Sequence, residues 1–218
     1  IRISGIQGAL SSQATIGQIT IADREGIWLR ISNASIDWSR STLLLRQRLE
    51  VQRLAAESIE VERRPLPDEG LPAPESRSFQ VPELPLAVNL AQLEIETATF
   101  GEGVFGLAAQ LALTGALKID GGTLDTNFDV RRLDGPGGQF ALNAAFSNET
   151  EELDLDLVLD EPADGVVANL LNVQGRPPLK LTIAGSGPLS ALDVKLALEA
   201  DGVPAFGGTA RLRERDEG

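Results

Sequence analysis

Strict alternation of apolar and polar residues recurs along this chain and constrains its fold more than any other feature. The stretch Glu152–Asp160 reads ELDLDLVLD, so its leucines and aspartates occupy alternate positions. Successive side chains of a β-strand point to opposite faces of a sheet, and this period therefore predicts a half-buried strand. The stretch Thr123–Arg132 repeats the pattern, with Leu124, Phe128 and Val130 on one face.

Similar stretches follow one another through the C-terminal part of the chain, separated by glycine-rich turn signals such as Asp120-Gly-Gly. Hairpin-linked strands of near-constant length predict an antiparallel meander. The fold class we expect is mainly β, a curled antiparallel sheet with one or two short helices. The phase of the alternation predicts the following inward, groove-lining residues: Leu113, Leu117, Ile119, Leu124, Phe128, Val130, Phe140, Leu142, Phe146, Leu153, Leu155, Leu157, Leu159, Leu181, Ile183, Val194, Leu196 and Leu198.

We expect three segments along the chain. Residues 1–64 form an N-terminal β segment with strands at Thr15–Ile21, Ile27–Trp38, Arg48–Gln52 and Ser58–Glu62, and a helical turn at Ser39–Leu45. Residues 65–85 contain six prolines, which a central strand does not accommodate, so they are a linker or loop between two parts of one continuous sheet. Residues 86–218 form the meander, interrupted by one short helix near 162–173, where Val166, Val167, Leu170 and Leu171 have helical spacing.

The composition argues against several classes of function. The chain has no Cys and no His, which excludes disulfides, thiolate metal sites and a histidine general base. The net charge of −13 argues against nucleic-acid binding. The charge is unevenly spread, because residues 1–64 carry 9 arginines against 7 acids while the rest is strongly acidic. A near-neutral head would suit proximity to an anionic surface, although an ordinary solvated surface is the simpler interpretation.

One glycine motif resembles a dinucleotide-binding fingerprint. Gly101, Gly103 and Gly106 fit G-x-G-x-x-G after the candidate strand Leu93–Phe100, and Asp120 follows at a suitable distance. A Rossmann strand, however, is continuously apolar, whereas this strand alternates and carries charge. We therefore interpret the motif as a glycine-rich β-turn and expect no cofactor.

Acidic residues give two weak motifs. Asp125, Asn127 and Asp129 begin like an EF-hand loop, but Val130 and Pro136 stand where Gly and Glu are required. A second group, Asp154, Asp156, Asp160 and Glu161, could be offered for acid–base or metal chemistry. Both groups are interpreted mainly as solvated strand faces, so we expect neither a metal site nor an enzyme.

No stretch of the sequence is typical of a membrane span or a signal peptide. The longest uncharged run, Ile3–Ala22, is rich in Gly, Ser, Thr and Gln, so it is uncharged without being apolar. The first residue is not Met, and the chain contains none. We therefore expect a processed chain or a fragment whose anchor, if it has one, has been removed.

The predicted apolar face must either pack against another part of the protein or remain exposed as a surface that can bind a ligand. The single meander helix is too small to cover a sheet of at least six strands. A second packed sheet would give a closed sandwich, whereas curling gives a barrel or an open gutter. An open gutter exposes a contiguous apolar surface, and such surfaces usually mark binding sites.

The order of motifs resembles the TamB family. The N-terminal motifs are Ile36-Asp37-Trp38-Ser39, the apolar turn Leu43–Leu45 and the stretch Arg46–Leu54, which continues through Ala56, Ile59 and Val61, all within the similar stretch Ile16–Val61. A second block, similar to alphaproteobacterial members, comprises Arg132–Gly138, Glu161–Leu171, Gly175–Leu179 and Gly185–Ser190.

The resemblance implies a periplasmic segment of an inner-membrane-anchored protein of the AsmA-like, bridge-type lipid-transfer class. Such proteins have a long open β-groove, or β-taco, and partner an outer-membrane Omp85-type barrel similar to TamA. Their proposed roles are phospholipid passage between membranes and assistance in outer-membrane protein assembly. Two hypotheses follow: the groove holds phospholipid acyl chains, or the chain is a scaffold that binds client β-strands at a sheet edge.

Overall fold

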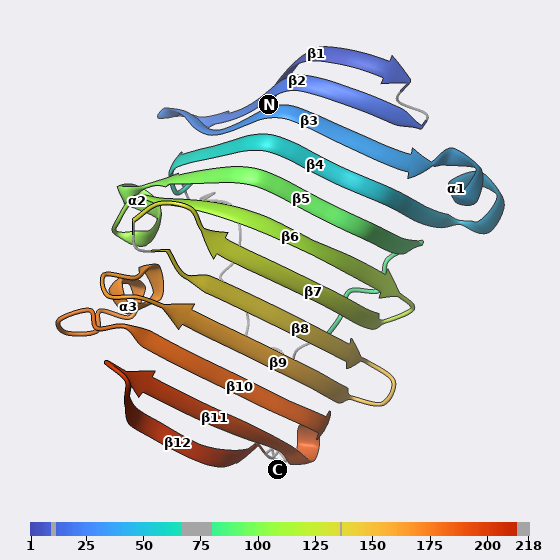
Figure 1. The fold of residues 1–218 in the computed structure, drawn as a ribbon. Helices are drawn as coiled ribbons and strands as arrows, with labels where there is room; N and C mark the ends of the chain where they lie inside the picture. Colours follow the sequence, from blue (N-terminus) through green and yellow to red (C-terminus); the bar gives the residue numbers. More distant parts are fainter. Residues whose placement is uncertain (10–11, 67–79, 136, 213–218) are drawn as a thin grey trace.

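A single β-sheet dominates the computed structural model, which describes residues 1–9, 12–66, 80–135 and 137–212 (Figure 1). Its twelve strands lie in the order in which they occur along the chain. They are β1 (Arg2–Ala9), β2 (Gln13–Asp23), β3 (Gly26–Ser39), β4 (Arg48–Arg63), β5 (Ala87–Gly101), β6 (Ala109–Asp120), β7 (Thr123–Arg132), β8 (Gln139–Ser147), β9 (Glu152–Glu161), β10 (Leu179–Pro188), β11 (Leu192–Ala200) and β12 (Val203–Leu212).

The sheet is curled and is not closed into a barrel, so β1 and β12 are its two free edges (Figure 1). The described strands form no second sheet. The expected mainly β, open and curled fold is therefore confirmed, and the closed sandwich that the alternation also allowed is wrong for the described residues.

One pair of neighbouring strands departs from the expected antiparallel pattern. β4 and β5 run parallel, with the register Arg48↔Ala87 at one end and Val61↔Phe100 at the other. Parallel neighbours need a connection that returns along the whole strand. The proline-rich segment predicted at 65–85 makes this return, although residues 67–79 lie outside the described residues. The sheet is continuous on both sides of it.

Within the described residues, three short α-helices lie at the ends of strands. α1 (Arg40–Arg46) joins β3 to β4, as the sequence predicted, and α3 (Val166–Leu170) lies within the predicted 162–173. α3 is shorter than expected because it begins after the N-cap Gly165 rather than at Pro162. α2 (Glu102–Phe105) was predicted only as a turn, and it brings the number of short helices to three rather than one or two.

The strand β4 is one long element, whereas the sequence predicted two strands, Arg48–Gln52 and Ser58–Glu62. Val51, Leu54, Ala56 and Ile59 pair with residues of one face of β5, so the inward positions are spaced unevenly. β-Bulges produce this spacing. At one of them, Asp37 and Trp38 of β3 are consecutive, but they pair with Arg53 and Val51 of β4, so β4 has one extra residue there. The bulges hide a continuous strand from a search for strict period-2 alternation.

Candidate functional site

The strand register brings the predicted groove-lining residues together on one face of the sheet. Directly paired residues of neighbouring strands share a face, so the pairing can be followed from strand to strand. In one row, Phe128, Leu142, Leu157, Ile183 and Leu196 lie side by side on β7–β11. The other rows are Leu113, Val130, Phe140, Leu159, Leu181 and Leu198; Leu117, Leu155 and Val194; and Ile119, Leu124, Phe146 and Leu153. We call this surface the apolar face.

The apolar face is only partly shielded from solvent. Of the predicted lining residues, Phe146 and Leu159 are buried, at 4% and 5% exposure, and all the others are half-buried. A covered core would bury most of these side chains, as protein interiors are close-packed. The described residues provide neither a second sheet nor a long helix over this face. It is therefore an open apolar surface across many strands.

The N-terminal strands extend the same face beyond the residues that the sequence singled out. Leu93 pairs with Gly115 of β6, Leu54 pairs with Leu93, and Ile36 pairs with Leu54. Trp38 is opposite Val51 at one end of these strands. The sequence signal was present in the apolar positions of β3–β5, but the bulges interrupted its period.

Two small or polar residues within the apolar face have specific packing roles. Gly115 is opposite Phe128, and a Cβ at Gly115 would lie 2.5 Å from the Phe128 ring, so glycine leaves the space that the ring occupies. Thr126 is 8% exposed, and its hydroxyl donates to the Ala116 carbonyl over 2.9 Å. The buried hydroxyl is thus satisfied within the sheet.

α3 closes one end of the apolar face around a buried carboxylate. Glu161 is 6% exposed and accepts hydrogen bonds from the amides of Val167 (2.9 Å) and Ala168 (2.6 Å) at the start of the helix. Those amides otherwise have no hydrogen-bond acceptor within the helix, so the contact gives the amides an acceptor and the buried carboxylate two donors. A hollow of about 140 Å³ lies here, lined mainly by Leu111, Val130, Phe140, Leu159, Val166 and Val167.

Arg132 lies at the rim of this hollow and is held by Asp134. The Arg132 Nε atom is 2.9 Å from Asp134 Oδ1, which also accepts from the Gln110 amide over 3.0 Å. Burial alone would raise the pKa of the Asp134 carboxyl, but the hydrogen bonds from Arg132 and Gln110 outweigh burial and lower that pKa below its ordinary value. The pair fixes the β7–β8 connection beside α3.

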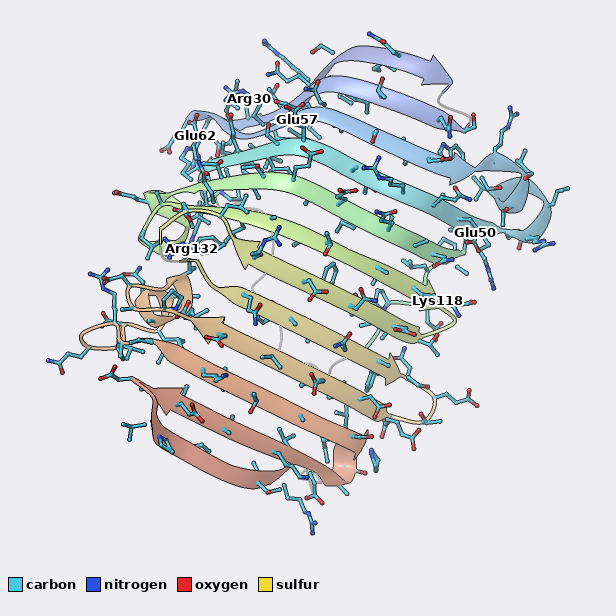
Figure 2. The ribbon with its side chains drawn as sticks, in the orientation of Figure 1. Arg30, Glu50, Glu57, Glu62, Lys118 and Arg132 are labelled. Atoms are coloured by element: carbon cyan, nitrogen blue, oxygen red, sulfur yellow. The ribbon has the colours of Figure 1, made fainter. Side chains whose placement is uncertain are left out.

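The opposite face of the sheet is polar and carries the acidic motifs. Figure 2 labels Arg30, Glu50 and Lys118, and the register places all three on this face. A shallow hollow of about 520 Å³ on it is lined by side chains such as Asp125, Asn127, Asn143, Asp154, Asp156 and Lys195. The described residues contain no group of three or more metal-ligand side chains arranged to hold an ion.

The structure separates the four acids considered for acid–base chemistry. Asp154, Asp156 and Asp160 alternate on the polar face of β9, whereas Glu161 is buried against α3. Asp154 accepts a hydrogen bond from the Ser186 hydroxyl, and Asp160 is 3.6 Å from the Lys180 ammonium. These groups do not converge on one point, so they do not form a catalytic pair.

The glycine motif is explained by close packing at a strand end. β5 and β6 are antiparallel and joined by α2, so the motif does not stand in a parallel β–α–β unit. A Cβ on Gly101 would lie 2.3 Å from the Glu62 carbonyl oxygen of β4. Gly106 ends α2 in the left-handed conformation with φ of 81°.

Comparison with protein-family models, curated proteins and solved structures finds no significant match to this chain. The apolar face and the polar face are therefore interpreted from their own chemistry. No helix in the described ranges is long and apolar enough to cross a membrane.

Proposed function

We propose that the apolar face holds phospholipid acyl chains. The observation that carries the proposal is a continuous aliphatic surface, built from neighbouring strands, whose side chains are half-buried except at its ends, and over which the described residues place no second sheet and no long helix. The backbone N–H and C=O groups beneath it are paired in the strand ladders, so an acyl chain lying there meets few unsatisfied polar groups. Leu, Ile and Val side chains make no directional demands, which suits chains of varied length.

The resemblance to the TamB family extends this proposal to a cellular role. The chain would be a periplasmic segment of an inner-membrane-anchored protein, and its groove would conduct phospholipids between the inner and outer membranes. An outer-membrane Omp85-type barrel similar to TamA would be its partner. No catalytic chemistry is needed, because an acyl chain moves along the face without a covalent step.

Site-specific photo-crosslinking tests the proposal with a matched pair of neighbours. A photoreactive side chain at Leu142 lies on the apolar face, and one at Asn143 lies on the polar face of the same strand. We expect the Leu142 variant to capture phospholipid, identified by mass spectrometry after extraction, and the Asn143 variant to capture at least about tenfold less. Equal capture at the two positions, or none at Leu142, would contradict the proposal.

A second candidate function rests on the free edges of the sheet. Val203 and Phe206 on β12 are 63% and 58% exposed, and Ile3 and Ile6 on β1 are about half exposed. An exposed apolar edge strand can pair with a strand of another chain. The chain would then be a scaffold for client strands in outer-membrane protein assembly. Crosslinking from Val203 to a purified, unfolded barrel protein, without lipid capture at Leu142, would favour this function.

A further inference from the structure

α1 presents two leucines to solvent at the connection between β3 and β4. Leu44 and Leu45 are 67% and 83% exposed, whereas Leu43 is half-buried. The helix has defined ends: the Ser39 hydroxyl accepts from the Thr42 amide over 3.3 Å, and Gln47 closes the last turn in the left-handed conformation. Figure 1 shows α1 projecting beyond the ends of the neighbouring strands. The leucines are therefore held outward by an ordered turn.

Unneutralised positive charge flanks these leucines. Arg40 and Arg46 are both exposed, and neither forms an ion pair with any other described residue. No acidic residue occurs in the sequence between Trp38 and Leu49. The chain as a whole has a net charge of −13. This cationic, apolar tip is thus opposite in charge to the molecule that carries it.

We propose that α1 is a membrane-docking tip for an anionic lipid surface, in which Leu44 and Leu45 enter the bilayer interface while Arg40 and Arg46 contact headgroup phosphates. Exposed apolar side chains and cationic flanks are the two features that bind short helices to anionic membranes. Charge complementarity selects this partner, since the acidic remainder of the chain would be repelled by the same surface. The tip then fixes which end of the sheet faces the membrane.

The tip is distinct from the apolar face and goes beyond the proposed function. Lipid on the apolar face would contact half-buried strand residues, whereas the tip engages a membrane from the sheet margin. A second exposed leucine pair, Leu170 and Leu171 at α3, provides a comparison. Its nearby Arg176 is paired with Asp164 over 3.2 Å, so this pair lacks the free arginines of the tip.

Vesicle co-sedimentation of the full chain tests the tip. Phosphatidylcholine vesicles with and without phosphatidylglycerol are compared for the wild type, Leu44→Ser/Leu45→Ser, Arg40→Gln/Arg46→Gln and the control Leu170→Ser/Leu171→Ser. We expect the wild type to bind only the anionic vesicles, and to bind less as salt rises. The Leu44→Ser/Leu45→Ser change should lower partitioning at least about tenfold. Loss of each arginine should lower partitioning onto anionic vesicles about fivefold, and the control should bind these vesicles like the wild type.

Trp38 gives a second readout, because it directly precedes the N-cap of α1 and the only other tryptophan is Trp28. In a Trp28→Phe background, anionic vesicles should shift the Trp38 emission to shorter wavelength, and Leu44→Ser/Leu45→Ser should abolish the shift. Because these leucines are exposed, thermal melting should stay unchanged. Equal binding to vesicles with and without phosphatidylglycerol, or no binding to either, would contradict the proposed docking tip. So would wild-type binding by Leu44→Ser/Leu45→Ser, or an equal loss of binding in the control Leu170→Ser/Leu171→Ser. Lipid capture at Leu142 is measured separately, so the two proposals fail independently.

Discussion

At the residue scale, neighbouring positions of one strand face differ in how much solvent they reach. Leu157 is half-buried in the middle of β9, whereas Leu159, two residues along, is 5% exposed beside α3. Both lie on the apolar face, opposite Ile183 and Leu181 of β10. A charged group at Leu157 can turn toward water, but one at Leu159 would be enclosed by its neighbours.

Substituting Asp at these two leucines should therefore give different outcomes. Leu159→Asp buries an unpaired charge and should cost several kcal/mol, roughly half of a typical stability of ~5–15 kcal/mol. Leu157→Asp should cost about 1–2 kcal/mol and leave the fold intact, while it reduces lipid capture at Leu142 in the next strand. Thermal melting and photo-crosslinking measure the two effects. If Leu157→Asp unfolds the chain as Leu159→Asp does, the face is a closed core; if it folds and captures lipid normally, Leu157 does not line the groove.

At the element scale, an ion pair fastens the ends of β2 and β4 across β3. Arg63 Nη1 and Nη2 donate to the two carboxylate oxygens of Asp23 over 2.8 and 2.5 Å, and Nη2 also donates to the Gly26 carbonyl over 3.3 Å. The Leu66 amide donates to Asp23 over 3.1 Å at the start of the proline-rich connection. The bidentate hydrogen bond from Arg63 holds the pKa of the Asp23 carboxyl well below its ordinary range.

This lowered pKa predicts a loss of stability in acid. With a pKa of about 3.9, the unfolded Asp23 takes up a proton before the folded one does, so protons favour unfolding in that range. The contribution of Asp23 should be complete above about pH 5 and should decline as the pH falls through the unfolded pKa toward its lower folded pKa. The difference in denaturation midpoint between the wild type and Asp23→Asn should therefore shrink from pH 5 to pH 2. Parallel pH profiles for the two proteins would show that the pair does not stabilise the fold.

The sequence predicted individual elements well where the alternation is unbroken. The alternate residues Leu153, Leu155, Leu157 and Leu159 of β9, and Leu124, Phe128 and Val130 of β7, fall on the face that their phase indicated. It failed at β4, which is one strand over Arg48–Arg63 and was expected as two. Irregular pairing interrupts the period there: Asn33 of β3, with a positive φ of 50°, lies between Ile31 and Ala34, which both pair with apolar residues of β4. The parallel β4–β5 pairing was also missed, because alternation carries no information on strand direction. Likewise, the burial of Glu161 depends on α3, which follows it in the chain.

At the scale of the whole molecule, the sheet is assembled by contacts between neighbours. Each strand is paired only with the strands directly before and after it in the sequence, and the described elements form no central core that all strands share. Alternation alone could not distinguish this open sheet from a sandwich, since both leave one apolar face on every strand. In such an open sheet, the stability of each strand depends mainly on its pairing with its two neighbours, as in repeat proteins.

Local opening should therefore become easier toward the two edges. The side chains of residues 203–211 in β12 are exposed on both faces, and the strand pairs only with β11, whereas β6 pairs with both β5 and β7 along most of its length. In native-state hydrogen exchange, amides of β1 and β12 should exchange at least about tenfold faster than those of β5–β9, a difference of about 1.4 kcal/mol in opening free energy. Mild denaturant should widen the exchanging region inward from the edges. Uniform protection across all strands, lost in one step, would instead indicate a single cooperative core, which an open sheet joined only through neighbouring strands does not provide.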